Sequence, residues 1–115
     1  MGFIRHHAMM VTHWDIDRID VAHGEAIRNG LDVSGIQVTE INGYATFCVF
    51  PDGSKEGWTY SANGDIGRDA FVAWLRAQES EPGYPLYEWA ELCYGSDDEG
   101  ATLTRHAWSR LEVTP

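Results

Sequence analysis

The chain has 115 residues, a hydrophobic fraction of 43%, and five Trp, five Tyr and four Phe. This composition excludes intrinsic disorder and predicts one domain with its own core. Its formal net charge of −10 at pH 7 disfavours binding to nucleic acid or anionic membranes and favours basic surfaces. No run approaches the roughly 18 apolar residues of a membrane helix, and the first residues lack a secretory-signal pattern, so we expect a cytoplasmic protein.

The first predicted helix follows an irregular start. Residues 1–12 are expected to form a flexible N-terminal arm, and residues 13–115 to form the single folded domain. From Asp15 onward, apolar residues recur at helical spacing, which predicts a helix over residues 15–29. Asp15 is the expected N-cap, Arg28 complements the negative end of the helix dipole, and Asn29-Gly30 ends the helix.

A block of strands is predicted next. Residues 36–41 and 44–50 are rich in β-branched or aromatic residues and are separated by Asn42-Gly43. That dipeptide favours a tight hairpin, because both central positions of a type I′ turn have positive φ. A third strand is expected over residues 58–62, which gives an antiparallel meander.

The period becomes helical again after Asn63-Gly64 and predicts a second helix that ends before Glu81-Pro82-Gly83. Residues 86–95 and 101–111 then fit a second hairpin, although residues 86–94 also fit a helical period and that alternative stays open. The predicted order is α-β-β-β-α-β-β. The sequence therefore predicts an α+β fold with an antiparallel sheet of about five strands and two helices packed on one face.

The residues that could take part in catalysis, metal binding or nucleic-acid binding do not form a recognised motif. His6, His7 and His13 lack a nearby Cys, Asp or Glu at a zinc-binding spacing, so we expect no metal site. Cys48 and Cys93 lie in apolar runs and are expected to be small buried residues, with a disulfide as the alternative. The eight Lys and Arg residues are dispersed, which argues against direct nucleic-acid binding. We expect no enzyme and no cofactor.

The acidic, aromatic segment of residues 79–99 is the strongest functional signal, because no Lys or Arg occurs between Arg76 and Arg105. A solvated loop above core aromatics is the simpler interpretation. The functional interpretation is a recognition surface in which rings supply buried area and carboxylates attract a basic partner. Its predicted residues are Tyr87, Glu88, Trp89, Glu91, Tyr94, Asp97, Asp98 and Glu99.

In size, charge and order of elements, the chain is similar to several phage-encoded inhibitors, including some anti-CRISPR and anti-restriction proteins. The resemblance implies a stoichiometric binder, often one that fills a nucleic-acid groove, but it assigns no site residue. We therefore expect a non-enzymatic acidic binding protein that docks a basic surface, such as that of a nucleic-acid-binding protein. The alternatives are a homo-oligomeric accessory protein, such as a homodimer, and a small enzyme that uses His and carboxylate groups.

Overall fold

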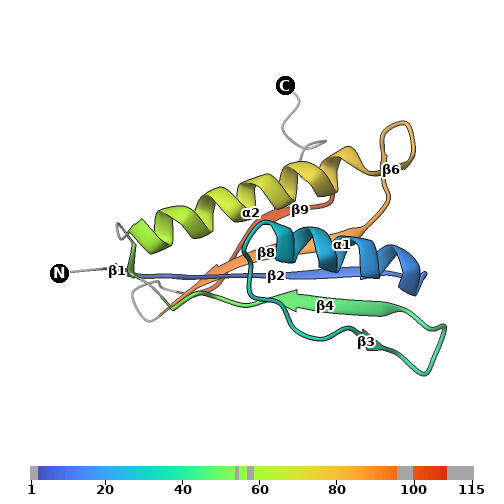
Figure 1. Cartoon of the computed structure of the whole chain (residues 1–115), viewed down its shortest axis with the longest axis horizontal. Coiled ribbons are helices and arrows are strands. Elements are labelled where there is room, and N and C mark those ends of the chain that lie inside the picture. The colour runs from blue at the N-terminus through green and yellow to red at the C-terminus, as the bar shows by residue number, and fades with distance from the viewer. Residues whose placement is uncertain (1–2, 54, 57–58, 96–99, 109–115) are drawn as a thin grey trace.

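The computed structural model describes residues 3–53, 55–56, 59–95 and 100–108 (Figure 1). Within these ranges, no helix combines the length and hydropathy needed to cross a lipid bilayer. The elements are β1 (Phe3–Ile4), β2 (His6–His13), α1 (Ile16–Arg28), β3 (Gln37–Val38), β4 (Ala45–Val49), β5 (Lys55–Glu56), α2 (Thr59–Ala77), β6 (Glu79–Glu81), β7 (Tyr84–Pro85), β8 (Glu88–Tyr94) and β9 (Thr102–His106).

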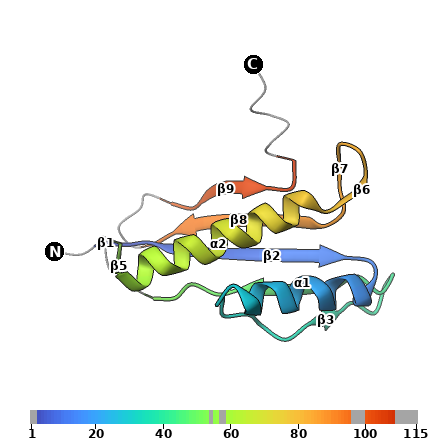
Figure 2. The same ribbon diagram turned by 45° about the horizontal axis from the view of Figure 1, so that its top comes forward.

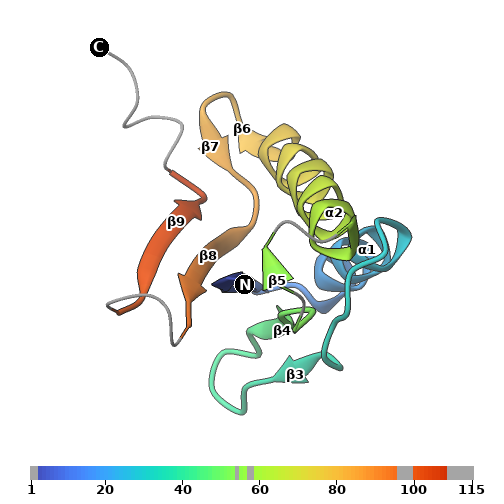
Figure 3. The same cartoon turned by 90° about the vertical axis from the view of Figure 1, so that its left-hand side faces the viewer.

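The main sheet has five antiparallel strands in the spatial order β3-β4-β2-β8-β9. Both helices lie on the same side of this curved sheet (Figure 3). Two small ribbons, β1-β5 and β6-β7, complete the described strands. The predicted α+β class, the five-stranded antiparallel sheet and the placement of both helices on one face are confirmed, whereas the order of elements along the chain differs.

The N-terminal segment is where the chain order departs most from the prediction. Residues 6–12, predicted to belong to a flexible arm, lie in β2, which is the central strand of the sheet (Figure 2). Met9 and Val11 are buried against the helices, whereas Met10 is exposed on the other face. The arm prediction is therefore wrong for these residues. Two consecutive methionines and the polar histidines conceal the alternation of buried and exposed residues that marks a strand. The position at the chain terminus also led to the prediction of a flexible arm.

Helix α1 agrees with its prediction at both ends. The side chain of Asp15 accepts a hydrogen bond from the amide of Asp17, as an N-cap does, and Arg28 lies in the last turn. Gly30 follows with a φ of 78°, the left-handed conformation that ends many helices. Ile19, Ala22 and Ala26 are the buried stripe that faces the sheet.

The first hairpin forms at the predicted place, but its strands are shorter and its loop is longer than a two-residue type I′ turn. The register pairs Val38 with Ala45, and the amide of Thr39 donates to the carbonyl of Tyr44 at 2.8 Å, so residues 40–43 form the loop. Asn42 and Gly43 end this loop with φ values of 64° and 65°, in the left-handed region. Strand β3 covers only two of the residues in the predicted strand of residues 36–41.

The predicted strand over residues 58–62 is wrong, because helix α2 already begins at Thr59 and continues through Asn63-Gly64. The two glycines of this segment permit close packing and do not form a turn. A Cβ on Gly64 would lie 2.7 Å from a carboxylate oxygen of Asp52, and one on Gly67 would lie 2.5 Å from the carbonyl oxygen of Asn29. Glycine is required at position 67, where the neighbour is backbone, whereas the end of the Asp52 side chain beside Gly64 can move.

The C-terminal hairpin resolves the open alternative for residues 86–94. Residues 88–94 form strand β8, so the helical alternative is wrong. Side chains alternate between the helix-covered face and the opposite face, as the period of a strand requires. The breaker cluster Glu81-Pro82-Gly83 forms the tight turn of the β6-β7 ribbon, with Gly83 at a φ of 86°.

The hydrophobic core lies between the helices and the sheet. Phe47 of β4 packs against Phe71 of α2 with ring centroids 6.4 Å apart and against His23 of α1 at 5.1 Å. The core is therefore built around the central strands. Its buried members are Met9, Val11, Ile19, Ala22, Ala26, Ala45, Phe47, Val49, Phe71, Val72, Leu75, Tyr87, Trp89 and Ala107.

Paired substitutions in β2 test whether the N-terminal segment is a core strand. Met9 is 1% exposed and Met10 is 54% exposed, although they are neighbours in the sequence. We expect Met9→Ala to lower the free energy of unfolding by about 2–5 kcal/mol and Met10→Ala to lower it by less than about 1 kcal/mol. Urea unfolding followed by circular dichroism measures both. Equal, negligible losses in the two variants would contradict the central position of β2.

Candidate functional site

The structure divides the predicted site residues between the two faces of the sheet. Tyr87, Trp89 and Glu91 point into the core and are 2%, 6% and 3% exposed. Glu88 and Tyr94 lie on the opposite, outward face. The predicted acids Asp97, Asp98 and Glu99 fall outside the described residues. The recognition surface as predicted is therefore wrong for the three buried residues, because an element of period two cannot present all five on one face.

Glu91 belongs to a buried ion-pair network. Its carboxylate accepts two hydrogen bonds from Arg105, both at 2.8 Å, and one from the Thr104 hydroxyl at 2.8 Å. Arg68 of α2 approaches the same carboxylate at 3.4 Å, and Arg105 also donates to Asp69 at 2.9 Å. The network ties α2 to β8 and β9, so Glu91 has a structural role.

Opposing effects determine the charge of Glu91. Burial alone would raise the pKa of this carboxyl, but the hydrogen bonds from Arg105 and Thr104 and the positive charges of Arg105 and Arg68 hold the pKa below its usual value. The carboxylate is consequently ionised at neutral pH and fully engaged by its partners. It is not free to act as a proton donor or acceptor.

A separate hollow lies at the end of the sheet where β2 ends and β8 begins. It has a volume of about 160 Å³, and we call it the aromatic hollow. The elements that meet there are the ends of β2 and β9, the start of β8 and the residues just before β4. The lining residues are Thr12, His13, Trp14, Tyr44, Pro85, Leu86, Tyr87, Glu88 and Trp108.

Three exposed rings form the walls of the aromatic hollow. Trp14, Tyr44 and Trp108 are 65%, 36% and 43% exposed, which is high for such large apolar groups. Each lies next to the end of an element or loop: Trp14 precedes the helix N-cap, Tyr44 follows the loop between β3 and β4, and Trp108 follows β9. A fourth exposed ring, Tyr84, packs edge-on against Trp108 at a centroid distance of 5.8 Å.

Buried rings form a fixed floor. His13 stacks on Trp14 with centroids 5.2 Å apart and meets the edge of Tyr87 at 5.6 Å. The amide of Asp15 donates to Nδ1 of His13 at 2.9 Å, so the neutral ring carries its hydrogen on Nε2. The Tyr87 hydroxyl donates to the carbonyl of Arg18 at 2.8 Å. The floor is thus held in place by bonds to the start of α1.

Tyr87 is a neutral hydrogen-bond donor in this floor. Burial raises the pKa of its phenol, the Arg18 charge lowers the pKa, and the Asp15 charge raises it, with a net upward shift. Tyr87, which the sequence predicts to be part of a recognition surface, is therefore buried and supports the exposed rings around it.

Glu88 gives the hollow its negative charge. It is exposed on the outward face of β8 and is the acidic residue among the described lining residues. Two further exposed acids, Glu79 and Glu81, lie on β6, which pairs with the strand that carries Tyr84 and Pro85. Exposed rings beside a carboxylate favour an organic cation, because the ring faces and the carboxylate attract the same charge.

The size of the aromatic hollow restricts what it can hold. Its volume of about 160 Å³ is well below the roughly 300–1,000 Å³ of pockets for drug-sized ligands. A single side chain fits this space, whereas a nucleotide does not. Two of its polar groups are already engaged, since the Thr12 hydroxyl bonds to that of Thr46 at 2.8 Å and the amide of Asp15 donates to Nδ1 of His13. The geometry suits binding better than proton transfer.

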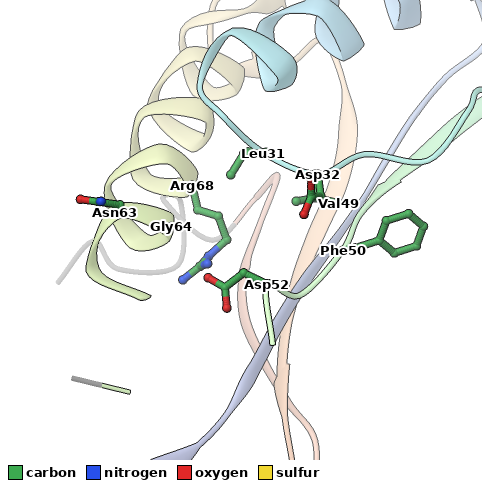
Figure 4. A pocket seen from close by; sticks show the side chains of 8 residues that line it. All are labelled: Leu31, Asp32, Val49, Phe50, Asp52, Asn63, Gly64 and Arg68. Carbon is green, nitrogen blue, oxygen red and sulfur yellow. The ribbon is translucent and has the colours of Figure 1, made fainter. Parts of the chain in front are cut away.

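A second hollow of about 100 Å³ lies at the opposite end of β4 (Figure 4). The Asp52 carboxylate and the Arg68 guanidinium point toward one another across it (Figure 4). Arg68 also forms ion pairs with Asp65 and Glu91. The cation of this hollow is therefore used within the protein, in the ion pairs that dock α2.

The remaining polar candidates do not converge. Among the described residues, no three His, Cys, Asp or Glu side chains gather closely enough to hold a metal ion. His6 lies in β2 with its ring 5.3 Å from that of Tyr94. Cys48 and Cys93 are both free thiols, on the two strands that flank β2.

Comparison of the chain with known protein families, with curated proteins and with solved structures finds no match in any of the three. Functional inference therefore depends on the geometry of the chain itself. Trp14, Tyr44 and Trp108 were not predicted as site residues. A sequence signal for the first two exists, since a large ring directly beside a cap or a tight turn has little core to pack into.

The ion-pair network predicts a large effect of one charge. We expect Glu91→Gln to lower the free energy of unfolding by about 1–3 kcal/mol, because the buried guanidinium of Arg68 and the half-buried one of Arg105 lose a shared counter-charge and keep only their partners on α2, Asp65 and Asp69. Glu88→Gln, on the same strand but exposed, serves as the matched control and is expected to change it by about 0.5 kcal/mol or less. Urea unfolding at pH 7 measures both. Similar stabilities of the two variants would contradict a buried, paired Glu91.

The same network predicts that the free energy of unfolding depends on pH. Because the pKa of Glu91 is lowered on folding, the unfolded chain binds more protons in the acidic range, and stability falls as pH decreases. The contribution is complete above the usual glutamate pKa of about 4.5 and is lost as pH falls through the lowered pKa. We expect wild-type protein to lose more stability than Glu91→Gln between pH 6 and the acidic limit of folding. Parallel stability curves would contradict this assignment.

Proposed function

We propose that this chain is a non-enzymatic binding protein that docks a basic protein surface and takes a Lys or Arg side chain of its partner into the aromatic hollow. One observation carries the proposal: Trp14, Tyr44 and Trp108 are exposed around a hollow of about 160 Å³ beside the carboxylate of Glu88. Rings of this kind are usually buried unless a partner covers them.

The contacts of a bound side chain follow from the lining. The aliphatic stem of Lys or Arg packs against the exposed rings, and the charged end meets ring faces and Glu88. Arg gains more than Lys from stacking, because its guanidinium is planar and weakly hydrated. The fixed floor of His13 and Tyr87 means that little ordering is needed on binding, which favours affinity.

The overall charge supports the same partner class. A net charge of −10 accelerates encounter with basic proteins and repels nucleic acid. A nucleic-acid-binding protein is one partner with such a surface, and an inhibitor of phage type is the finer form of this proposal. That finer form depends on the resemblance in size and charge, whereas the hollow supports only the capture of a basic side chain.

Small cations provide a direct test. We expect N-acetyl-arginine amide and N-acetyl-lysine amide to shift the indole NMR signals of Trp14 and Trp108 with millimolar affinity, whereas N-acetyl-norleucine amide, which lacks the charge, shifts them at least about fivefold more weakly. Glu88→Gln should weaken cation binding about three- to tenfold.

Asp20→Asn is the matched control, because it removes one exposed carboxylate from α1 and leaves the hollow unchanged. If both variants bind the cations equally, the attraction is only a property of the net charge. If the uncharged amide binds as well as the charged ones, the hollow is an apolar pocket and the proposal is wrong.

A further inference from the structure

The helices leave one face of the sheet uncovered (Figure 3). On this face, the outward side chains of the neighbouring strands β2 and β8 form a row. The register of β2 with β8 places Thr12 opposite Glu88, Met10 opposite Ala90, and Ala8 opposite Leu92. In the last two pairs a small residue faces a large one. Ala8 and Ala90 therefore form dips between the side chains of Leu92 and Met10.

Three hollows follow this row in sequence. The aromatic hollow shares Thr12 and Glu88 with a hollow of about 290 Å³ that extends to Met10 and Ala90. That hollow shares Met10 and Ala90 with a third, of about 100 Å³, that extends to Ala8 and Leu92. The aromatic hollow is thus one end of a continuous depression, which we call the β2–β8 groove.

The chemistry of the groove changes along its length. Glu88 provides a carboxylate at the aromatic end, whereas the rest is apolar, with Met10 54% and Leu92 39% exposed. Apolar residues on the neighbouring strands widen this part: Cys48 lies beside Met10, and Leu103 lies beside Leu92 and is 52% exposed. A contiguous outward apolar strip of this kind is typical of a binding surface.

We propose that the β2–β8 groove binds an extended segment of the partner, with a Lys or Arg in the aromatic hollow and apolar side chains at the second and fourth residues from it. This inference rests on the proposed function and adds the partner's sequence pattern. The spacing follows from strand geometry, because every second residue of an extended chain advances about 6.6–6.8 Å on one face. The steps from Thr12 to Met10 and from Met10 to Ala8 have the same length.

Charge complementarity selects this occupant over a second copy of the chain. A copy packed on the same face would bring its own Glu88 and a further net charge of −10. The outward residues of β2 and β8 include no Lys or Arg, so that face of a copy has no cation to place in the aromatic hollow. A basic segment supplies the cation and the apolar side chains together.

An oriented peptide library tests the pattern without knowledge of the partner. We suggest eleven-residue peptides with Lys or Arg fixed at the centre and all other positions varied, probed with the full chain. We expect Leu, Ile, Val, Met or Phe to be enriched at the second and fourth positions on one side of the fixed residue, and not at the first and third. The enriched peptide should bind at least about tenfold more tightly than a version with its apolar residues moved by one position.

Substitutions separate the groove from the hollow. Leu92→Glu should weaken the enriched peptide at least about tenfold while leaving the affinity for N-acetyl-arginine amide unchanged. Glu88→Gln should weaken both ligands. Ile41→Glu, at a 78% exposed position in the β3-β4 turn, is the matched control and should change neither. Met10→Glu, at an even more exposed groove position, replaces Leu92→Glu if that variant fails to fold.

The outcomes distinguish this inference from the proposed function. Binding of peptides that carry the fixed basic residue, without enrichment of apolar residues at alternate positions, overturns the groove and leaves the proposed function intact. If the wild-type chain binds neither the peptides nor the amides, the proposed function is overturned as well. A dimer in sedimentation that Leu92→Glu dissociates would show that a second copy covers the face, which also overturns the inference.

Discussion

Strand β2 pairs with β4 on one side and with β8 on the other, so it joins the two halves of the sheet. Burial of Met9, Val11 and His13 under the helices fixes the register of this strand. The same register turns Ala8, Met10 and Thr12 outward. Core packing on one face therefore determines which side chains line the groove on the other, and a one-residue slip would exchange the two sets.

The buried network around Glu91 divides the acidic composition into two roles. Glu91 is neutralised by Arg105 and Arg68 and holds α2 against the end of the sheet. Glu88, three residues earlier and on the opposite face, is exposed at the aromatic hollow. Sequence composition does not distinguish these two carboxylates, but the alternation of β8 buries one in the ion-pair network and leaves the other exposed at the proposed binding site.

Local signals explain which elements could be predicted. The Asp15 cap and the left-handed conformation of Asn42-Gly43 depend on a few neighbouring residues, and both formed, although the loop is longer than the predicted turn. The strand predicted at residues 58–62 and the arm predicted at residues 1–12 failed at residues 59–62 and 6–12, since tertiary contacts of α2 and β2 decide the structure there. The strand predicted over residues 86–95 puts Glu88 and Glu91 on opposite faces but does not say which face is outward, and the rings of the aromatic hollow come from three distant segments that no local pattern connects.

The hollow lies where β2 ends and β8 begins, beside the first turn of α1. Of the exposed rings there, Trp14 stacks on His13 and Trp108 packs against Tyr84. Trp14 stacks on the buried His13, which is itself fixed by the first turn of α1, so the exposed ring is held rigidly by the core beneath it. A preorganised exposed ring loses little conformational entropy on binding. In the proposed function, recognition therefore depends on the rings at the sheet end, and the acids provide long-range attraction.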